Sequence, residues 1–292
     1  MNRRDLLKTV GAAVGSTLGA QGLRAQETAG SDPGRVGILV DTTMCIGCRT
    51  CELACVEAHQ DAGLESPEDV DFSVERTTSE NQWTVVNRYE TDKGEVFRKT
   101  QCMHCLQPAC ASACLTRAMH KTPAGPVAWD EDKCMGCRFC MLSCPFDVPK
   151  FEYDSPVPRI QKCTMCWDRV AEGGVPTCVE NCPAGALTFG LRSELLDEGR
   201  HRIYTEPDKY VHHVYGEDEA GGTGYLYLAA VPFEQLGLRT NLATTSYPAF
   251  TREFLYGVPV VLTLVPPFLV ALNRGFRDRS LSEGESGKAA DK

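Results

Sequence analysis

Sixteen cysteines, all between Cys45 and Cys182, are the residues of this chain whose type and spacing could do chemistry. They form four groups of four. The first and third groups have the spacing C-x2-C-x2-C-x3-C, the second has four residues in its middle gap, and the fourth has eleven. The groups are Cys45, Cys48, Cys51 and Cys55; Cys102, Cys105, Cys110 and Cys114; Cys134, Cys137, Cys140 and Cys144; and Cys163, Cys166, Cys178 and Cys182.

This spacing favours iron–sulfur chemistry. Three thiolates at three-residue steps on one tight loop can bind three irons of a cubane cluster, and a more distant cysteine binds the fourth iron. Gly47 and Gly136 precede the second cysteine of their groups, where the lack of a side chain suits a crowded loop. Disulfides give no reason for the repeated step, and zinc sites favour two C-x2-C pairs around one ion. The sequence therefore predicts four 4Fe–4S clusters, with a zinc-binding structural scaffold as the alternative of another class.

The flanks of the groups indicate how the cysteines pair. In two-cluster ferredoxins the fourth cysteine of each run ligates the other cluster. A short linker joins the second and third groups into one such unit. GILVD before Cys45 and ALTFG after Pro183 are typical strands, so the first and last groups are expected to form a second unit around it. The predicted ligand sets are Cys45, Cys48, Cys51 and Cys182 (cluster A); Cys163, Cys166, Cys178 and Cys55 (cluster B); Cys102, Cys105, Cys110 and Cys144 (cluster C); and Cys134, Cys137, Cys140 and Cys114 (cluster D).

To position these thiols we expect an α+β fold. It consists of two nested bacterial-ferredoxin-like units and one C-terminal transmembrane helix. We expect a four-cluster domain over residues 28–215, with an insertion at 56–101, followed by a linker or partner-contact segment at 216–252. Within the insertion, WTVVNRYETDKGEVFRKTQ alternates around Asp92, Lys93 and Gly94 and predicts a β-hairpin. The run GGTG at 221–224 does not open a helix after a strand, and it predicts a turn.

Both ends of the chain carry targeting features. Arg3 and Arg4, before a short and weakly apolar run, resemble a twin-arginine signal peptide, which we assign to residues 1–27. The nineteen residues from 254 to 272 carry no charge. This length suffices for one membrane span, and the predicted transmembrane helix is 253–273. Arginines follow at once, so the tail, 274–292, is expected in the cytoplasm and the body on the periplasmic side of the inner membrane. Its composition after Arg279 favours disorder.

Other features of the chain argue against other functions. The formal net charge of −9 disfavours nucleic acid, which needs a basic surface. The sequence has no Ser/His/Asp arrangement, P-loop or HExxH motif, so no catalytic residue is predicted. His104 lies within a cysteine loop but is not needed as a ligand, and His212 and His213 are expected to have a structural or interface role.

The four groups in this order resemble the four-cluster iron–sulfur subunits of the DMSO-reductase family. These carry electrons for molybdoenzymes, formate dehydrogenases and some hydrogenases, and their fold would cover about residues 37–190. The twin-arginine signal, the segment YVHHVYGEDEAGGTGYLYLAAVPFEQLGL and the single anchor resemble the HybA-type subunits of periplasmic NiFe uptake hydrogenases. That resemblance implies a NiFe hydrogenase heterodimer and an integral membrane quinone-reactive subunit as partners. The alternative is the equivalent subunit of a formate dehydrogenase or another molybdoenzyme.

Overall fold

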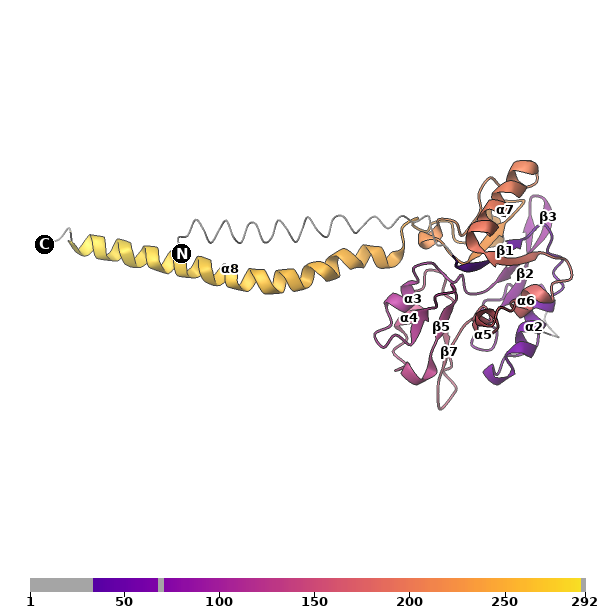
Figure 1. The fold of residues 1–292 in the computed structure, drawn as a ribbon, viewed down its shortest axis with the longest axis horizontal. Helices are drawn as coiled ribbons and strands as arrows, with labels where there is room; N and C mark the ends of the chain where they lie inside the picture. Colours follow the sequence, from indigo (N-terminus) through magenta and orange to yellow (C-terminus); the bar gives the residue numbers. More distant parts are fainter. Residues whose placement is uncertain (1–33, 68–70, 290–292) are drawn as a thin grey trace.

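A cysteine-bearing head and one long C-terminal helix make up the part of the chain that the structure, a computed structural model, describes: residues 34–67 and 71–289 (Figure 1). The predicted signal peptide, 1–27, lies outside these residues. In chain order the elements are β1 (Val36–Asp41), α2 (Thr50–Ala58), the 3-10 helix η1 (Gln60–Ala62), β2 (Val85–Thr91), β3 (Gly94–Thr100), α3 (Ala109–Ser112), β4 (Met119–Lys121), β5 (Val127–Trp129), η2 (Glu131–Lys133), α4 (Phe139–Ser143), β6 (Lys150–Phe151), β7 (Ile160–Gln161), α5 (Trp167–Ala171), α6 (Thr177–Glu180), β8 (Leu187–Leu191), α7 (Arg192–Thr205), η3 (Glu219–Gly221), β9 (Tyr225–Leu228), η4 (Phe233–Leu236) and α8 (Tyr247–Ala289).

A three-stranded sheet in the order β8-β1-β9 forms the centre of the head. β1 pairs antiparallel with β8, which places Val40 opposite Leu187. These two strands are the ones predicted from GILVD and ALTFG, one just before the first cysteine group and the other just after the last. The sheet therefore brings the first and fourth cysteine groups close together in space, although the second and third groups lie between them in the sequence.

The side chains of this sheet alternate between two apolar layers, as the period of a β-strand requires. On one face, Ile38 of β1 and Tyr225 of β9 belong to a buried cluster that also contains Met103 and Cys178, residues of the cysteine loops. On the other face, Leu39 and Leu226 pack with the leucines of α7. The helix covers one side of the sheet, and the cysteine loops cover the other.

Residues 225–236 of the segment 216–252, predicted as a linker or partner-contact segment, contribute instead to this core. β9 pairs parallel with β1, and its four residues are buried. The buried Arg192 fixes the turn before β9, because its guanidinium donates to the carbonyls of Gly216 at 3.1 Å, Glu217 at 2.9 Å and Thr223 at 2.7 Å. For β9 the prediction of a linker was wrong, because a parallel pairing with a strand far back in the sequence leaves no local pattern. The turn predicted at 221–224 is confirmed by the left-handed Gly221 and Gly222.

The hairpin predicted within the insertion is confirmed: β2 and β3 pair antiparallel in the register Thr91 to Gly94. A buried carboxylate attaches it to the first cysteine loop. Glu52 of α2 accepts a hydrogen bond from the backbone N–H of Val86 at 2.6 Å and pairs with Arg76 at 2.7 Å. The hairpin is therefore tied to the helix that carries Cys51 and Cys55.

This buried pair predicts a stability effect. The change Glu52→Gln keeps the size of the side chain but leaves the Arg76 charge, which is 11 % exposed, without its counter-charge. Breaking a buried pair in this way costs about 3 kcal/mol. We expect the urea midpoint, followed by the visible absorption of the loaded protein, to fall accordingly. Glu95→Gln removes the partner of Arg88 in an exposed pair and is the matched control, with an expected cost below about 1 kcal/mol. Equal losses in both variants would contradict this explanation.

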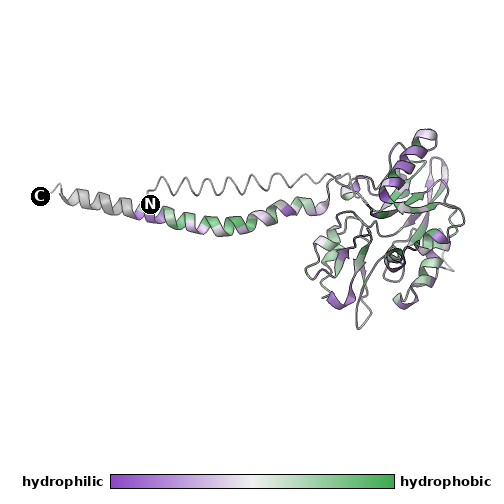
Figure 2. Ribbon diagram, viewed as in Figure 1, coloured by the Kyte–Doolittle hydropathy of each residue, from purple (hydrophilic) through white to green (hydrophobic). Residues whose placement is uncertain are grey.

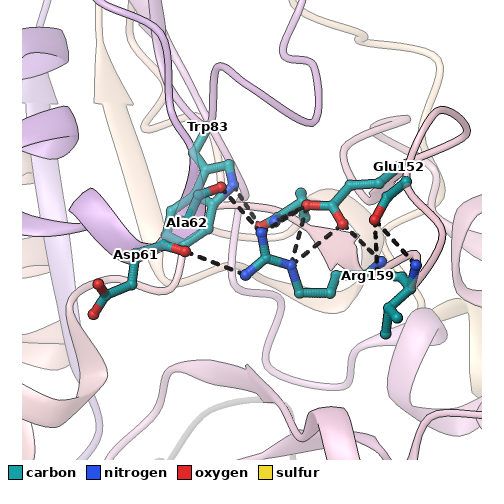
Figure 3. A network of polar contacts seen from close by, with 8 residues as sticks. Asp61, Ala62, Trp83, Glu152 and Arg159 are labelled. Carbon is teal, nitrogen blue, oxygen red and sulfur yellow. Dashed lines mark hydrogen bonds and ion pairs between the residues drawn. The ribbon is translucent and has the colours of Figure 1, made fainter.

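A second polar network joins the insertion to the strands before the fourth cysteine group (Figure 3). Arg159 pairs with Glu152 at 3.0 Å and donates to the carbonyls of Asp61 and Ala62. Gln161 of β7 donates to the same glutamate and accepts a hydrogen bond from the Trp83 indole at 3.0 Å. The network thereby holds the β6–β7 hairpin against the insertion.

α8 extends away from the head and is apolar along its middle (Figure 2). Among the described residues it is the one helix long and apolar enough to cross a membrane, over Tyr247–Arg277, and none of its apolar window is buried in the head. Pro259, Pro266 and Pro267 lie inside it. The helix begins at Tyr247, before the predicted residue 253, and continues to Ala289. Residues 280–289, which were expected to be disordered, are therefore helical.

Candidate metal-cluster sites

The backbone at the second cysteine of every group adopts left-handed conformations that fold the loop tightly. In groups one and three the glycine before that cysteine and the arginine after it have nearly equal φ angles: Gly47 70° and Arg49 59°, Gly136 69° and Arg138 59°. Groups two and four have His104, Met165 and Cys166 in this region, at φ 47°, 57° and 47°. The repeated loop geometry turns successive thiols toward one side.

The reason for glycine differs between the two loops. A Cβ at Gly47 would lie 2.5 Å from the ring of Phe97, whereas a Cβ at Gly136 would meet its nearest atom, in Phe151, at 3.9 Å. Crowding, the reason expected from the sequence, therefore applies at Gly47. At Gly136 the positive φ alone favours glycine.

Four thiols from the first and last groups line one cavity, which lies beside β1 and β8. They are Cys45, Cys48, Cys51 and Cys182. The rest of its wall is mainly apolar, with Val40, Ile46 and Leu187. Burial raises the pKa of Cys45, and the neighbouring Cys182 raises it further.

A second cavity lies beside the first and is lined by thiols from the same two groups. They are Cys55, Cys163, Cys166 and Cys178. Three of these are buried: Cys55, Cys163 and Cys178. Burial and then the neighbouring Cys163 raise the pKa of Cys55 well above its ordinary value.

The second and third groups give the remaining two sets of thiols. A third cavity is lined by Cys114, Cys134, Cys137 and Cys140. The four cysteines that remain are Cys102, Cys105, Cys110 and Cys144. Burial raises the pKa of Cys105, and the charges of Cys102, Cys144 and Cys110 raise it further. In both sets, three thiols come from one group and the fourth comes from the other.

Neighbouring sets adjoin in one linear order. Cys51 of the first cavity packs in one apolar cluster with Cys178 of the second. Cys163 of the second packs with Cys102, and Cys110 packs with Cys140 of the third cavity. The exposed thiols, Cys48 and Cys137, belong to the two ends of this order.

The electrostatics of these sites favour a bound cationic centre. Burial and like-charged neighbours raise the pKa of Cys102 and of Cys140 to about 11 each, because four thiolates cannot share a dry pocket without compensation. Thiolates are the ligands of metals, and a metal supplies that compensation. Sets of four thiols around one cavity therefore fit a 4Fe–4S cluster, which every one of its thiolates binds through a different iron.

Cys166 differs from the three buried thiols of its set. Burial opposes ionisation there, but hydrogen bonds from His59 and Thr177 lower the pKa of Cys166 to about 7. The His59 ring also bonds the Cys55 carbonyl at 2.9 Å. His59, which the sequence analysis did not single out, therefore orients two ligands of one set. A histidine four residues after Cys55, directly following α2, was the available signal.

The described residues hold no group of three His, Cys, Asp or Glu side chains close enough to bind a single metal ion. His104 is fully buried, and its Nδ1 accepts a hydrogen bond from the Val127 N–H at 2.8 Å. His212 bonds the Pro207 carbonyl, and His213 bonds Glu219 at 2.7 Å. These contacts are structural.

Comparison with known proteins gives the same chemistry. Two family models, both described as 4Fe–4S dicluster domain, match residues 44–118 and 95–192. The chain thus has two dicluster domains, which hold up to four clusters, and sixteen cysteines to bind them.

Several curated proteins are similar over most of the chain. A protein of Nitratidesulfovibrio vulgaris is 46 % identical over 92 % of this chain and 75 % of its own length. The hydrogenase-2 operon protein HybA of Escherichia coli O157:H7 is 35 % identical over 95 % of this chain and 97 % of its own. The iron–sulfur subunit of the nitrate-inducible formate dehydrogenase of Escherichia coli K12 is 33 % identical over 66 % and 67 %.

Proposed function

The chain belongs to the family of 4Fe–4S electron-transfer subunits that contains HybA and the formate dehydrogenase iron–sulfur subunits, and we propose that it relays electrons for a periplasmic NiFe hydrogenase. In this proposal four 4Fe–4S clusters connect the hydrogenase to a quinone-reactive integral membrane subunit. The lining of three cavities by four cysteines each is the observation that carries it.

The proposed ligand sets are those of clusters A to D, and they make the two units nested. The cavity linings support A, B and D, and the mutual effects of Cys102, Cys105, Cys110 and Cys144 support C. The antiparallel pairing of β1 with β8 supports a unit closed by the first and last groups.

Each bound cluster supplies reversible one-electron transfer. The protein holds the clusters at fixed separations and keeps water from those at B and C, where five of the eight thiols are buried. The adjacency of the thiol sets supports the order A, B, C, D, in which the exposed Cys48 and Cys137 mark the two ends. We assign these ends to electron entry and exit.

We further propose that α8 anchors the subunit, with the head on the periplasmic side and the C-terminus in the cytoplasm. The unburied apolar stretch of α8 supports an anchor. Arg274 and Arg277 directly after it support the orientation. The paired arginines at positions 3 and 4 support export of the folded chain by the twin-arginine route, since its clusters must be loaded before export.

A hydrogenase partner is favoured over a formate dehydrogenase because of coverage. The HybA match extends over 95 % of the chain, whereas the formate dehydrogenase match covers 66 %. The HybA match is long enough to include the segment after the clusters and the anchor. The partners of such a subunit would contact these two parts.

Metal analysis of the intact complex tests the proposal. We expect about 16 irons per chain, four for each cluster, together with nickel from the partner. Molybdenum or tungsten in place of nickel would identify the formate dehydrogenase alternative. Zinc in place of iron, without visible absorption that dithionite bleaches, would establish the structural scaffold and overturn the proposal.

A further inference from the structure

Two lysine side chains are buried among the cysteine sets. Lys99 is 2 % exposed and Lys162 is 3 % exposed. Lysine is almost never fully buried unless it is paired, but within the described ranges neither lysine forms an ion pair with a carboxylate. Their charges need another source of compensation.

Lys99 lies between the first two thiol sets. It lines both the cavity of Cys45, Cys48, Cys51 and Cys182 and the cavity of Cys55, Cys163, Cys166 and Cys178. The side chain therefore lies beside both sets.

The surroundings of Lys99 fix its position. Its Nζ donates to Gln101 Oε1 at 3.1 Å and lies 5.4 Å from the centre of the Tyr225 ring. Gln101 in turn donates to the hydroxyl of Tyr227 at 2.7 Å, and that hydroxyl donates to the Lys99 carbonyl at 2.9 Å. This closed network involves neutral groups only, so it holds the ammonium without neutralising it.

Lys162 has the corresponding place at the third set. Its Nζ donates to two carbonyls, of Val127 at 2.5 Å and of Cys163 at 3.1 Å. Val127 packs in one apolar cluster with Cys110, and Cys163 packs in another with Cys102. The second ammonium therefore belongs to the set of Cys102, Cys105, Cys110 and Cys144.

We propose that Lys99 and Lys162 are built-in counter-charges that raise the reduction potentials of particular clusters, Lys99 for both A and B and Lys162 for C. The inference rests on the proposed four-cluster function. A cluster with four thiolates is anionic and becomes more so on reduction, so a fixed cation close by favours the reduced form. The anionic clusters would also supply the compensation that no carboxylate gives these lysines.

Potentiometric titration of the intact complex, followed by EPR and visible absorption, tests this role with Lys99→Met and Lys162→Met. Methionine keeps most of the length and removes the charge. For Lys99→Met we expect two of the four midpoint potentials to fall, each by about 59 mV, which is a tenfold change in the one-electron equilibrium. For Lys162→Met we expect a different, single potential to fall. Lys133→Gln is the matched control: this lysine adjoins Cys134 but is 60 % exposed and paired with Asp130, and we expect no shift.

Iron content separates a failure of this inference from a failure of the proposed function. About 16 irons per chain with unchanged potentials in Lys99→Met would overturn the counter-charge while leaving the four-cluster relay intact. Loss of only the two clusters at A and B, with about half of the iron, would support the shared cation, because those eight thiolates then need it to assemble. Equal loss of all clusters in both methionine variants would show a general structural role and contradict the inference.

Discussion

Replacing Cys182 with alanine is expected to remove the cluster bound by Cys45, Cys48 and Cys51, and to leave the cluster of Cys163, Cys166 and Cys178 in place. Cys182 belongs to the fourth group by sequence, but it lines the cavity of the first group. Without a fourth thiolate one iron loses its protein ligand. We expect the iron content to fall from about 16 to about 12 per chain and electron transfer through the subunit to stop. Alanine is preferred to serine, whose hydroxyl can still bind iron.

The double variant with Cys45→Ala shows which cluster is lost. If Cys182 and Cys45 serve the same cluster, the double variant loses no more iron than either single variant and keeps about 12 irons. Cys178→Ala is the matched control, because Cys178 comes from the same group but lines the second cavity. Combined with Cys45→Ala it should leave about 8 irons. The reverse pattern, with Cys178 sharing a cluster with Cys45, would refute the nested pairing.

The spacing of the cysteines and the strands beside them could be read from the sequence because both are local patterns. A three-residue step defines a cluster loop, and the alternation around Asp92 and Gly94 defines a hairpin. Even the meeting of β1 with β8 had a local signal, since each strand adjoins a cysteine group. The groups thus carry long-range information about the fold.

The parts that the sequence analysis missed depend on long-range packing. β9 was taken for a linker because its parallel partner, β1, is far away in the sequence. Lys99 was read as a hairpin residue, and its burial contradicts the usual place of lysine at the surface. Only the folded chain brings Lys99 between two thiol sets. A residue whose environment opposes its ordinary preference is where function is expected to override local propensity.

Truncation of the chain after Arg252 is expected to release the subunit from the membrane without unloading its clusters. Twelve of the nineteen residues from Phe254 to Leu272 are Leu, Val or Phe, and together they favour insertion by about 5 kcal/mol. None of the apolar window is buried in the head, so the head loses no core when it is removed. We therefore expect about 16 irons per chain in a soluble fraction, with electron transfer to a water-soluble dye retained and quinone reduction lost.

A point variant tests whether the apolar character of α8, and not only the presence of the helix, anchors the subunit. Leu264→Arg places a charge near the middle of the span, which costs about 3 kcal/mol of insertion free energy, while Thr251→Arg places the same charge before the span. Expressed without partner subunits and separated by flotation, the Leu264→Arg protein should be depleted from the membrane fraction and the Thr251→Arg protein should not. Since the partners are absent, nothing else can retain the head. A truncated subunit that still floats with the membrane would show that α8 is not the anchor, and the route of electrons to quinone would then have to begin at another face of the head.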